Sequence, residues 1–270
     1  MGKVPTGVLE AQVVKEFGEQ WTKFQDNTGY YGSLEVFKDI VGSLLPIERI
    51  KGKTVAEIGS GTGRIVKMLD DAGAGTIVAV EPSEAMGPLR KNTENIKDKI
   101  EYIQKTGEAW SRPELDYVFS IGVIHHIVNP VPTVKNAREN LKSGGKFVIW
   151  VYGREGNELY LKLFEPIRKI TPKIPHFVLL SVSWVLLMCL NLYVWLCRHI
   201  TLPMRTYMLN HIGKLNQYSR RITIYDQLNP TWARYYTRAE AESLLRNNGF
   251  SDVRSFHRHG YSWTVIGTRD

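Results

Sequence analysis

Three glycines at alternate positions follow a short apolar run and directly precede a helix-like pattern. The stretch is VAEIGSGTGR, residues 55–64, in which Glu57 comes just before Gly59, Gly61 and Gly63. Glycines let the backbone turn sharply and let a ligand lie against bare peptide. The dinucleotide fingerprint has a different spacing, G-x-G-x-x-G, and places a pyrophosphate on the helix N-terminus. Because a carboxylate beside the loop would repel a pyrophosphate, Glu57 favours a ligand that carries an ammonium group.

Strand-like and helix-like runs alternate on both sides of this loop. Their hydrophobic patterns define the elements that must position it. We expect strands at 53–59, 76–82, 99–105, 115–124 and 144–152, and helices at 8–17, 34–45, 64–72, 83–95 and 132–141. Alternation of this kind predicts a parallel sheet with helices on both faces.

The end of the chain predicts one more helix and two more strands. Thr237 with Glu240 fits a capping box at the helix start, and Gly249 fits the helix stop. Two strand-like runs follow, at 250–257 and 261–269. Because the turn between them is short, they should form an antiparallel hairpin.

Three stretches together resemble the class I methyltransferases that use S-adenosylmethionine. They are EIGSGTG at 57–63, AVEPS at 79–83 and LDYVFSIGVIHHI at 115–127. Their order and spacing agree with that family over roughly residues 50 to 150, and the terminal helix and hairpin agree as well. The resemblance implies an α/β, doubly wound Rossmann-like fold with a seven-stranded sheet and a terminal antiparallel hairpin. It implies S-adenosylmethionine as cofactor and no metal.

The resemblance also assigns roles at the cofactor site. Glu57 and the glycines would hold the methionine part, and Glu81 would accept hydrogen bonds from both ribose hydroxyls. Residues 82–86 would line the adenine, and TGEAW at 106–110 would wrap it. The family often has Asp in that last segment, so the adenine contact stays open here between the Glu108 side chain and backbone groups. The predicted cofactor residues are Trp21, Glu57, Gly59, Ser60, Gly61, Gly63, Glu81, Pro82, Met86, Gly107, Glu108, Ala109 and Ile121.

His125 and His126 are the predicted catalytic residues. They follow the fourth strand, at the carboxyl edge of the sheet where ligands bind in such folds. Methyl transfer to a hydroxyl benefits from a general base near neutral pH, which suits histidine. The alternative is that one histidine packs and the other caps the next helix. Because neighbouring side chains point apart, we do not expect both to face the cofactor.

Aromatic residues near both ends of the chain could complete the site. In this family N-terminal helices commonly cover the cofactor, and Phe17–Trp21 could touch a sulfonium through cation–π contact. Plain packing is the alternative for these aromatics and for WARYY at 232–236. The predicted substrate residues are Tyr30, Tyr31, Tyr152, Tyr235 and Tyr236. We therefore expect a cofactor cover at 1–50, the sheet domain at 51–152 and 233–270, and a helical insertion or lid at 153–232.

The insertion contains an apolar stretch of unusual length. Phe177 to Cys197 is 21 residues without a charge, which is long enough to span a bilayer. A single crossing conflicts with the fold, because the terminal hairpin should pair with the same sheet that begins at 53. Three alternatives remain: a helical hairpin on the membrane surface with its bend near Asn191 or Pro203, an apolar lid over the site, or a helix in a dimer interface.

The residues that flank this stretch favour contact with an anionic surface. Prolines mark its entry and exit, and basic residues lie on both sides: Pro172, Pro175, Arg168, Lys169, Lys173, Arg198, Arg205, Lys214, Arg220 and Arg221. Such a pattern suits anionic lipid or a phosphate-bearing substrate. We expect membrane contact through 174–205, with a buried helix under the lid as the alternative.

Composition places the chain among globular proteins of basic charge. Hydrophobic content is 43%, net charge is +8 and the isoelectric point is about 9.3. The charge suits a phospholipid, a phosphorylated substrate or nucleic acid. The only cysteines, Cys189 and Cys197, lie inside the apolar stretch, which fits a reducing compartment. We expect a cytoplasmic protein, peripheral on the inner face of the cell membrane.

The predicted function is methyl transfer to a small-molecule acceptor, apolar or lipid-linked. Oxygen is the first choice of acceptor atom, then carbon or nitrogen. Nucleic acid is not the expected partner, because the chain has no asparagine-proline-proline-aromatic motif, no catalytic cysteine and no added RNA-binding module. RNA methylation and a non-catalytic scaffold that keeps the cofactor fold are the alternatives.

Overall fold

The chain folds into two compact units. The computed structural model describes residues 5–162, 171, 174 and 176–270. The first unit contains the residues up to Asn27, Gly32–Asn157 and Trp232–Asp270, and the second contains Thr28–Tyr31 and Glu158–Thr231. The functional assignments of a cofactor cover at 1–50 and a lid at 153–232 stay predictions.

The first unit is built on a seven-stranded sheet of order β3-β2-β1-β4-β5-β7-β6. Its strands are β1 (Thr54–Ile58), β2 (Thr76–Val80), β3 (Ile100–Ile103), β4 (Leu115–Ile121), β5 (Leu141–Tyr152), β6 (Phe250–Arg258) and β7 (Ser262–Arg269). The first five strands pair in parallel, and β7 pairs antiparallel with both β5 and β6. The predicted sheet and terminal hairpin are therefore confirmed.

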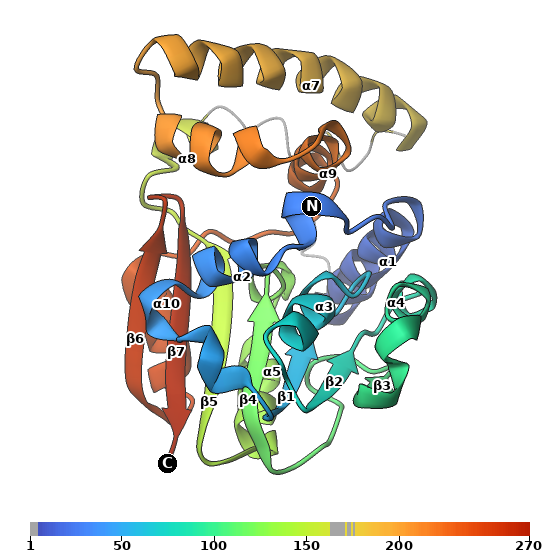
Figure 1. The fold of residues 1–270 in the computed structure, drawn as a ribbon, viewed down its shortest axis with the longest axis vertical. Helices are drawn as coiled ribbons and strands as arrows, with labels where there is room; N and C mark the ends of the chain where they lie inside the picture. The colour runs from blue at the N-terminus through green and yellow to red at the C-terminus, as the bar shows by residue number, and fades with distance from the viewer. Residues whose placement is uncertain (1–4, 163–170, 172–173, 175) are drawn as a thin grey trace. The chain divides into compact units, whose positions relative to one another are not determined.

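Helices lie between the strands, as the alternating pattern predicted (Figure 1). The α-helices of the first unit are α1 (Thr6–Lys23), α2 (Leu34–Val41), α3 (Arg64–Asp71), α4 (Met86–Asn92), α5 (Val131–Asn140) and α10 (Arg238–Arg246). Its short 3-10 helices are η1 (Gly29–Gly32, shared with the second unit), η2 (Gly42–Leu44), η3 (Ile47–Ile50), η4 (Glu94–Lys99) and η5 (Ile124–His126). Alternate strand residues such as Ala56, Ile58, Val78 and Val80 join the core with α5 and α10. Strand residues of the opposite parity are also buried, so the sheet is covered on both faces.

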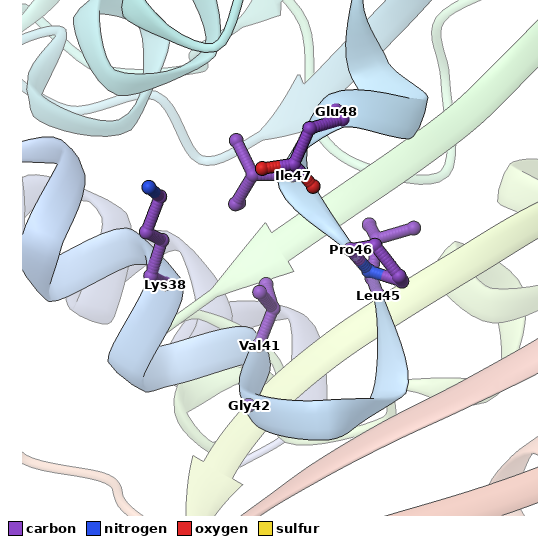
Figure 2. Close-up of a pocket in the computed structure, with 7 residues that line it drawn as sticks. All are labelled: Lys38, Val41, Gly42, Leu45, Pro46, Ile47 and Glu48. Atoms are coloured by element: carbon purple, nitrogen blue, oxygen red, sulfur yellow. The ribbon is translucent and has the colours of Figure 1, made fainter.

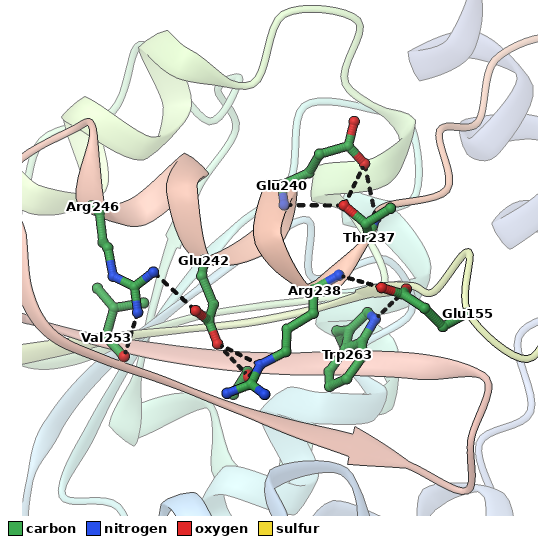
Figure 3. Close-up of polar contacts among 9 residues, drawn as sticks. Glu155, Thr237, Arg238, Glu240, Glu242, Arg246, Val253 and Trp263 are labelled. Atoms are coloured by element: carbon green, nitrogen blue, oxygen red, sulfur yellow. Dashed lines mark hydrogen bonds and ion pairs between the residues drawn. The ribbon is translucent and has the colours of Figure 1, made fainter.

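Polar contacts attach α10 to the terminal hairpin (Figure 3). The Thr237 hydroxyl accepts from the Glu240 backbone N–H, and the Glu240 carboxylate accepts from the Thr237 backbone N–H, so the predicted capping box is present. At the other end of the helix, Glu242 pairs with Arg246 and also accepts from Ser255 on β6. An N-cap of this kind stabilises a helix by roughly 1 kcal/mol.

Three helices differ in length from the sequence prediction. The helix expected at 83–95 is shorter, because α4 spans Met86–Asn92 and the 3-10 helix η4 follows it. The first helix continues to Lys23, well beyond Phe17, because its later residues pack against the rest of the unit; Gln20 is fully buried. The second ends at Val41, where Gly42 adopts a φ of 54°. A Cβ at Gly42 would lie 2.5 Å from the Phe256 ring, so the approach of β6 ends this helix.

The second unit is helical among the residues described. It contains α7 (His176–His199), α8 (Arg205–Asn210), η7 (Ile212–Lys214) and α9 (Gln217–Leu228), and α7 packs on α8 and α9. The first of these helices runs through Asn191 without a break, so the predicted bend there is wrong, whereas the chain does turn at Pro203. Asn191 is held by Gln217 and Arg220, and these bonds stabilise the unbroken helix. The predicted entry residues Arg168, Lys169, Pro172, Lys173 and Pro175 lie outside the described residues.

A shallow pocket lies on the segment that precedes β1 (Figure 2). Its lining residues are Lys38, Val41, Gly42, Leu45, Pro46, Ile47 and Glu48. This segment leads into the amino end of β1. Ligands in doubly wound sheets bind at the carboxyl ends of the strands, so this pocket is not the expected cofactor site.

Candidate active site

The glycine loop joins the carboxyl end of β1 to the start of α3. Gly59, Gly61 and Gly63 have φ angles of 77°, 51° and 85°, which L side chains rarely adopt. A Cβ at Gly59 would lie 2.5 Å from a methyl of Val123, in the loop after β4. The loops that follow β1 and β4 therefore meet at the point where the strand order reverses, which is where ligands bind in such sheets.

Glu81 connects the glycine loop to the loop after β2. Its Oε2 accepts from the Gly61 backbone N–H at 2.8 Å. Its Oε1 accepts from the backbone N–H and the hydroxyl of Ser83, at 3.0 and 2.5 Å. A carboxylate has about four lone-pair positions, and these three bonds leave room for about one more donor. The structure thus shows that Glu81 holds the two loops together, with room for one of the two predicted ribose hydroxyls.

Glu57 is a buried carboxyl at the same edge of the sheet. It is 1% exposed, and its Oε2 has no hydrogen-bond partner among the described residues. Burial raises the pKa of Glu57 well above its ordinary value, Arg64 opposes this rise, and the nearby Glu81 adds to it. A buried acceptor of this kind is costly unless a ligand supplies a donor. An ammonium group would satisfy it, as the sequence predicted.

The N-terminal segment contacts the glycine loop. A Cβ at Gly61 would lie 3.4 Å from Nε1 of Trp21, so the indole lies against the loop. Beyond the helix, the Asn27 side chain donates to the Thr62 carbonyl and accepts from the Thr62 hydroxyl, at 3.0 and 2.9 Å. Asn92 donates to the same carbonyl at 2.9 Å. Sequence reasoning missed both asparagines, because they lie 35 and 30 positions from Thr62 and no local pattern marks them.

The predicted adenine segment forms a tight turn with its tryptophan turned inward. The Trp110 indole is 2% exposed, lies in the main core and donates to the Gly107 carbonyl at 3.0 Å. Asn136 donates to that same carbonyl at 3.1 Å. The prediction that the whole of TGEAW wraps adenine therefore needs correction, because Trp110 is a core residue. Glu108 and Ala109 are exposed and remain predicted contacts.

The other predicted cofactor residues lie at the carboxyl ends of the same strands. Ser60 is buried in the glycine loop, and its hydroxyl donates to the Glu57 carbonyl at 3.2 Å. Pro82 is half-buried in the loop after β2, and Met86 is buried at the start of α4. Ile121 is buried at the end of β4, beside Trp150 on β5. Whether each of them contacts the cofactor stays a prediction.

The two histidines lie together in η5 and are both buried. Their ring centroids are 4.3 Å apart. The expectation that the neighbours point apart is wrong, because it holds for an extended chain and the strand ends at Ile121, before them. His125 packs on Tyr152 at 3.8 Å between ring centroids, and His126 on Phe17 at 4.6 Å.

His126 has a defined tautomer if it is neutral. Its Nδ1 lies 2.9 Å from the Trp232 carbonyl oxygen. A carbonyl oxygen can only accept, so Nδ1 must carry the proton, and the lone pair of a neutral ring is then on Nε2. The backbone carbonyl of His125 accepts from the Arg234 N–H at 2.8 Å. These contacts attach the segment before α10 to both histidines.

The predicted substrate tyrosines lie in different environments. Tyr152 ends β5, and Tyr235 stacks on it with centroids 5.3 Å apart. Tyr236 is 1% exposed and belongs to the main core, and burial raises its pKa to about 12. Its ring therefore packs in the core, and its phenol is protonated at neutral pH. Tyr30 and Tyr31 belong to the second unit, where they pack against a cluster of three buried residues, Val194, Ile212 and Leu215.

Comparison with known proteins identifies a domain in one part of the chain. Residues 56–149 match the model of a methyltransferase domain. This part of the chain is a class I methyltransferase domain. It contains the glycine loop, Glu81 and both histidines. The resemblance implies S-adenosylmethionine as cofactor, and solved proteins of this fold contain SAM or SAH.

Solved methyltransferases share the fold. Human N-acetylserotonin methyltransferase, in complex with SAM, superposes with a TM-score of 0.57 at 13% identity, over 98% of this chain and 60% of that one. Magnesium protoporphyrin IX methyltransferase from Synechocystis, with bound SAH, superposes with a TM-score of 0.51 at 12% identity, over 100% and 90%. At these identities the likeness shows the fold alone.

Curated relatives match the methyltransferase domain over a limited length. The tRNA U34 carboxymethyltransferase of Pseudoalteromonas translucida is 32% identical over 121 residues, which are 43% of this chain and 37% of the relative. The protein of the same name from Shewanella loihica is 30% identical over 122 residues, 42% and 35%. This chain thus spans little more than a third of those relatives. Because their names include tRNA, the expectation that nucleic acid is not a partner has no support from them.

Proposed function

We propose that the chain transfers a methyl group from S-adenosylmethionine to a hydroxyl of a small aromatic or apolar acceptor. The observation that carries this proposal is the hydrogen bond between Nδ1 of His126 and the Trp232 carbonyl oxygen. His126 lies among the rings of Phe17, His125 and Tyr152, beyond the carboxyl ends of β4 and β5. The aromatic rings can pack against a planar acceptor, and the oriented base can then remove the proton from its hydroxyl.

The chain has groups suited to hold the cofactor. Glu57 offers a buried acceptor to the ammonium, the glycine loop offers bare peptide, and Glu81 offers its remaining lone pair to a ribose hydroxyl. When bound, S-adenosylmethionine supplies a methyl group on a positively charged sulfur. Trp21 lies beside the same loop and contributes an aromatic face, which attracts cations.

His126 then acts as the general base. The acceptor oxygen would form a bond to the methyl carbon as the carbon–sulfur bond breaks, and the bonding electrons would leave with sulfur. The hydroxyl proton goes to Nε2 of His126, because Nδ1 already carries one. Positioned proton transfer of this kind contributes about 10²- to 10⁴-fold to a rate. The aromatic rings around the base exclude water and restrict the acceptor's orientation, which methyl transfer also requires.

A second candidate is modification of tRNA. It is favoured by the curated relatives, which are tRNA U34 carboxymethyltransferases and match over 119 to 122 residues. It is also compatible with the net charge of +8. The relatives match over only 35 to 37% of their own length. The match therefore supports the presence of a methyltransferase domain more strongly than it supports an RNA substrate.

The test is turnover with methyl-labelled S-adenosylmethionine. Purified protein is incubated with a panel of phenols and other aromatic hydroxyl compounds, and separately with total tRNA. We expect label in a methyl ether in the first incubation. Label in tRNA alone would overturn the small-molecule proposal, and product mass would then tell a methyl from a carboxymethyl group. Cofactor binding without turnover on either panel would favour a scaffold.

A further inference from the structure

Helix α7 presents an apolar outer face to solvent. We define this outer face by Trp184, Val185, Met188, Leu192 and Trp195, which are 53 to 65% exposed. Successive helix positions turn by about 100°, so these five residues lie within about 100° of one another. The residues buried against the rest of the unit, among them Leu187 and Val194, lie on the opposite side. Only 22% of the most apolar 18-residue stretch of this helix is buried, whereas the core helix of a soluble protein is mostly buried.

The opposite face attaches α7 to its neighbours along its length. The Ser183 hydroxyl accepts from Arg221, and the Asn191 side chain accepts from Arg220, at 3.0 and 2.7 Å. Near the helix end, Arg205 donates to the Cys197 carbonyl at 2.7 Å. A helix with these partners could cross a bilayer only by breaking the bonds or by drawing the arginines into hydrocarbon. Both are unfavourable, because each arginine strongly disfavours the hydrocarbon centre.

The sheet topology also opposes a crossing. Strand β5 precedes α7 in the chain, β7 follows it, and the two pair within one sheet. A crossing would require a second span to return, and the part of the chain that the structure describes has one helix of sufficient length and apolarity. The outer face can therefore meet lipid only with the helix axis along the membrane surface.

The positive charge of the segment around α7 favours anionic lipid as the partner of the outer face. Residues 158–231 contain nine Lys and Arg against three Asp and Glu, so this segment carries six of the eight net positive charges. Anionic lipid attracts such a segment, whereas a second copy with the same charge repels it. Tryptophans lie near both ends of the face, and indole rings are typical of the membrane–water interface.

We propose that the outer face of α7 binds the surface of a membrane that contains anionic lipid, with the helix parallel to the membrane plane. Trp184 and Trp195 are 11 residues apart, which is about 16 Å along a helix. In this orientation both indoles reach the same depth, just below the headgroups. The mode is that of an interfacial helix whose polar side is provided by α8 and α9.

The first experiment measures binding of the full chain to vesicles. Phosphatidylcholine vesicles with and without phosphatidylglycerol are sedimented with the protein at low and high salt. We expect binding to the anionic vesicles, weakened by salt. Met188→Glu combined with Leu192→Glu should reduce partitioning at least about tenfold, the effect of 1.4 kcal/mol. Val8→Glu is a control for one added negative charge away from α7, because Val8 is 58% exposed on α1, and it should bind nearly as the unmodified protein does.

The second experiment measures orientation. Tryptophan fluorescence is quenched by lipids brominated at defined depths in Trp184→Phe and in Trp195→Phe. Each substitution should remove a similar part of the fluorescence that is quenched by lipids brominated close to the headgroups. Loss of signal at very different depths would overturn the parallel orientation. Absence of vesicle binding, or a dimer in light scattering that the double substitution abolishes, would overturn the membrane proposal. S-adenosylmethionine binding by each variant tests the proposed function separately.

Discussion

Replacing Glu57 by Gln should weaken cofactor binding without harming the fold. The side chain is buried, and its Oε2 has no hydrogen-bond partner among the described residues. Gln keeps the shape and removes the charge that an ammonium would meet. A hydrogen bond to a charged group contributes about 1.5–3 kcal/mol. At 1.4 kcal/mol for each factor of ten, S-adenosylmethionine should bind about 10- to 150-fold more weakly to Glu57→Gln.

The pH dependence of binding should change in the same variant. Burial raises the pKa of Glu57, so the ligand-free carboxyl must lose a proton before it can pair with an ammonium. S-adenosylmethionine should therefore bind the unmodified protein more tightly as pH rises toward that raised pKa, with release of a proton. Isothermal calorimetry in buffers of different ionisation enthalpy measures this release. In Glu57→Gln both the pH dependence and the proton release should disappear.

As pH rises, the stability of the ligand-free protein should fall while its affinity for S-adenosylmethionine increases. The folded pKa of Glu57 lies above the unfolded value of about 4.3, so its stabilising contribution is complete below that value and is lost as pH rises through the folded pKa. Gln carries no charge to bury, so ligand-free Glu57→Gln should melt no lower than the unmodified protein at pH 8. Thermal unfolding followed by circular dichroism measures this.

Glu81→Gln is the contrasting variant. A Gln amide must place a donor against either the Gly61 or the Ser83 N–H, where Glu81 now accepts from both. An unsatisfied buried donor costs about 1–3 kcal/mol, so this variant should lose stability as well as affinity. Methylthioadenosine, which lacks the ammonium, should bind equally to the unmodified protein and to Glu57→Gln. Equal weakening for that ligand, or unchanged affinity for S-adenosylmethionine, would refute the assignment of Glu57.

Three further outcomes are expected from the same structure. His126→Gln should lower kcat about 10²- to 10⁴-fold in the methyl-transfer assay while calorimetry shows unchanged cofactor affinity; unchanged kcat would exclude the proposed base. Gly59→Ala should lower the melting temperature and abolish cofactor binding, because its φ is 77° and the new methyl would lie 2.5 Å from Val123, whereas Gly87→Ala, with open space around it, should not. Thr237→Ala should reduce the free energy of unfolding by about 0.5–2 kcal/mol in urea titrations, because it removes the capping box.

Local patterns carried most of the fold prediction. The strand that ends in VAEIG, the capping box at Thr237 and the turn at His259 and Gly260 each depend on residues close together in the chain. Hydrophobic period, caps and turn residues report such features directly. The conformation of the glycine loop was predictable for the same reason, since its glycines and Glu57 lie within seven residues.

Features that depend on distant parts of the chain were missed or wrong. Asn27 bonds to Thr62 across 35 positions, and no spacing rule joins them. The rings of His125 and His126 meet because the chain coils into a 3-10 turn after β4, where an extended chain would have separated them. Trp110 turns inward because the Gly107 carbonyl and the core together hold its indole.

The sequence by itself determined the α/β architecture, the glycine loop after β1 and the presence of an apolar segment between two parts of one sheet. Each follows from residue type and short-range spacing, which set local conformation. Only the tertiary structure decided that α7 is one unbroken helix and which side of it is buried. It also decided which nitrogen of His126 forms the hydrogen bond to the Trp232 carbonyl. Those properties depend on Arg220, Arg221 and Trp232, which approach their partners only after the chain has folded.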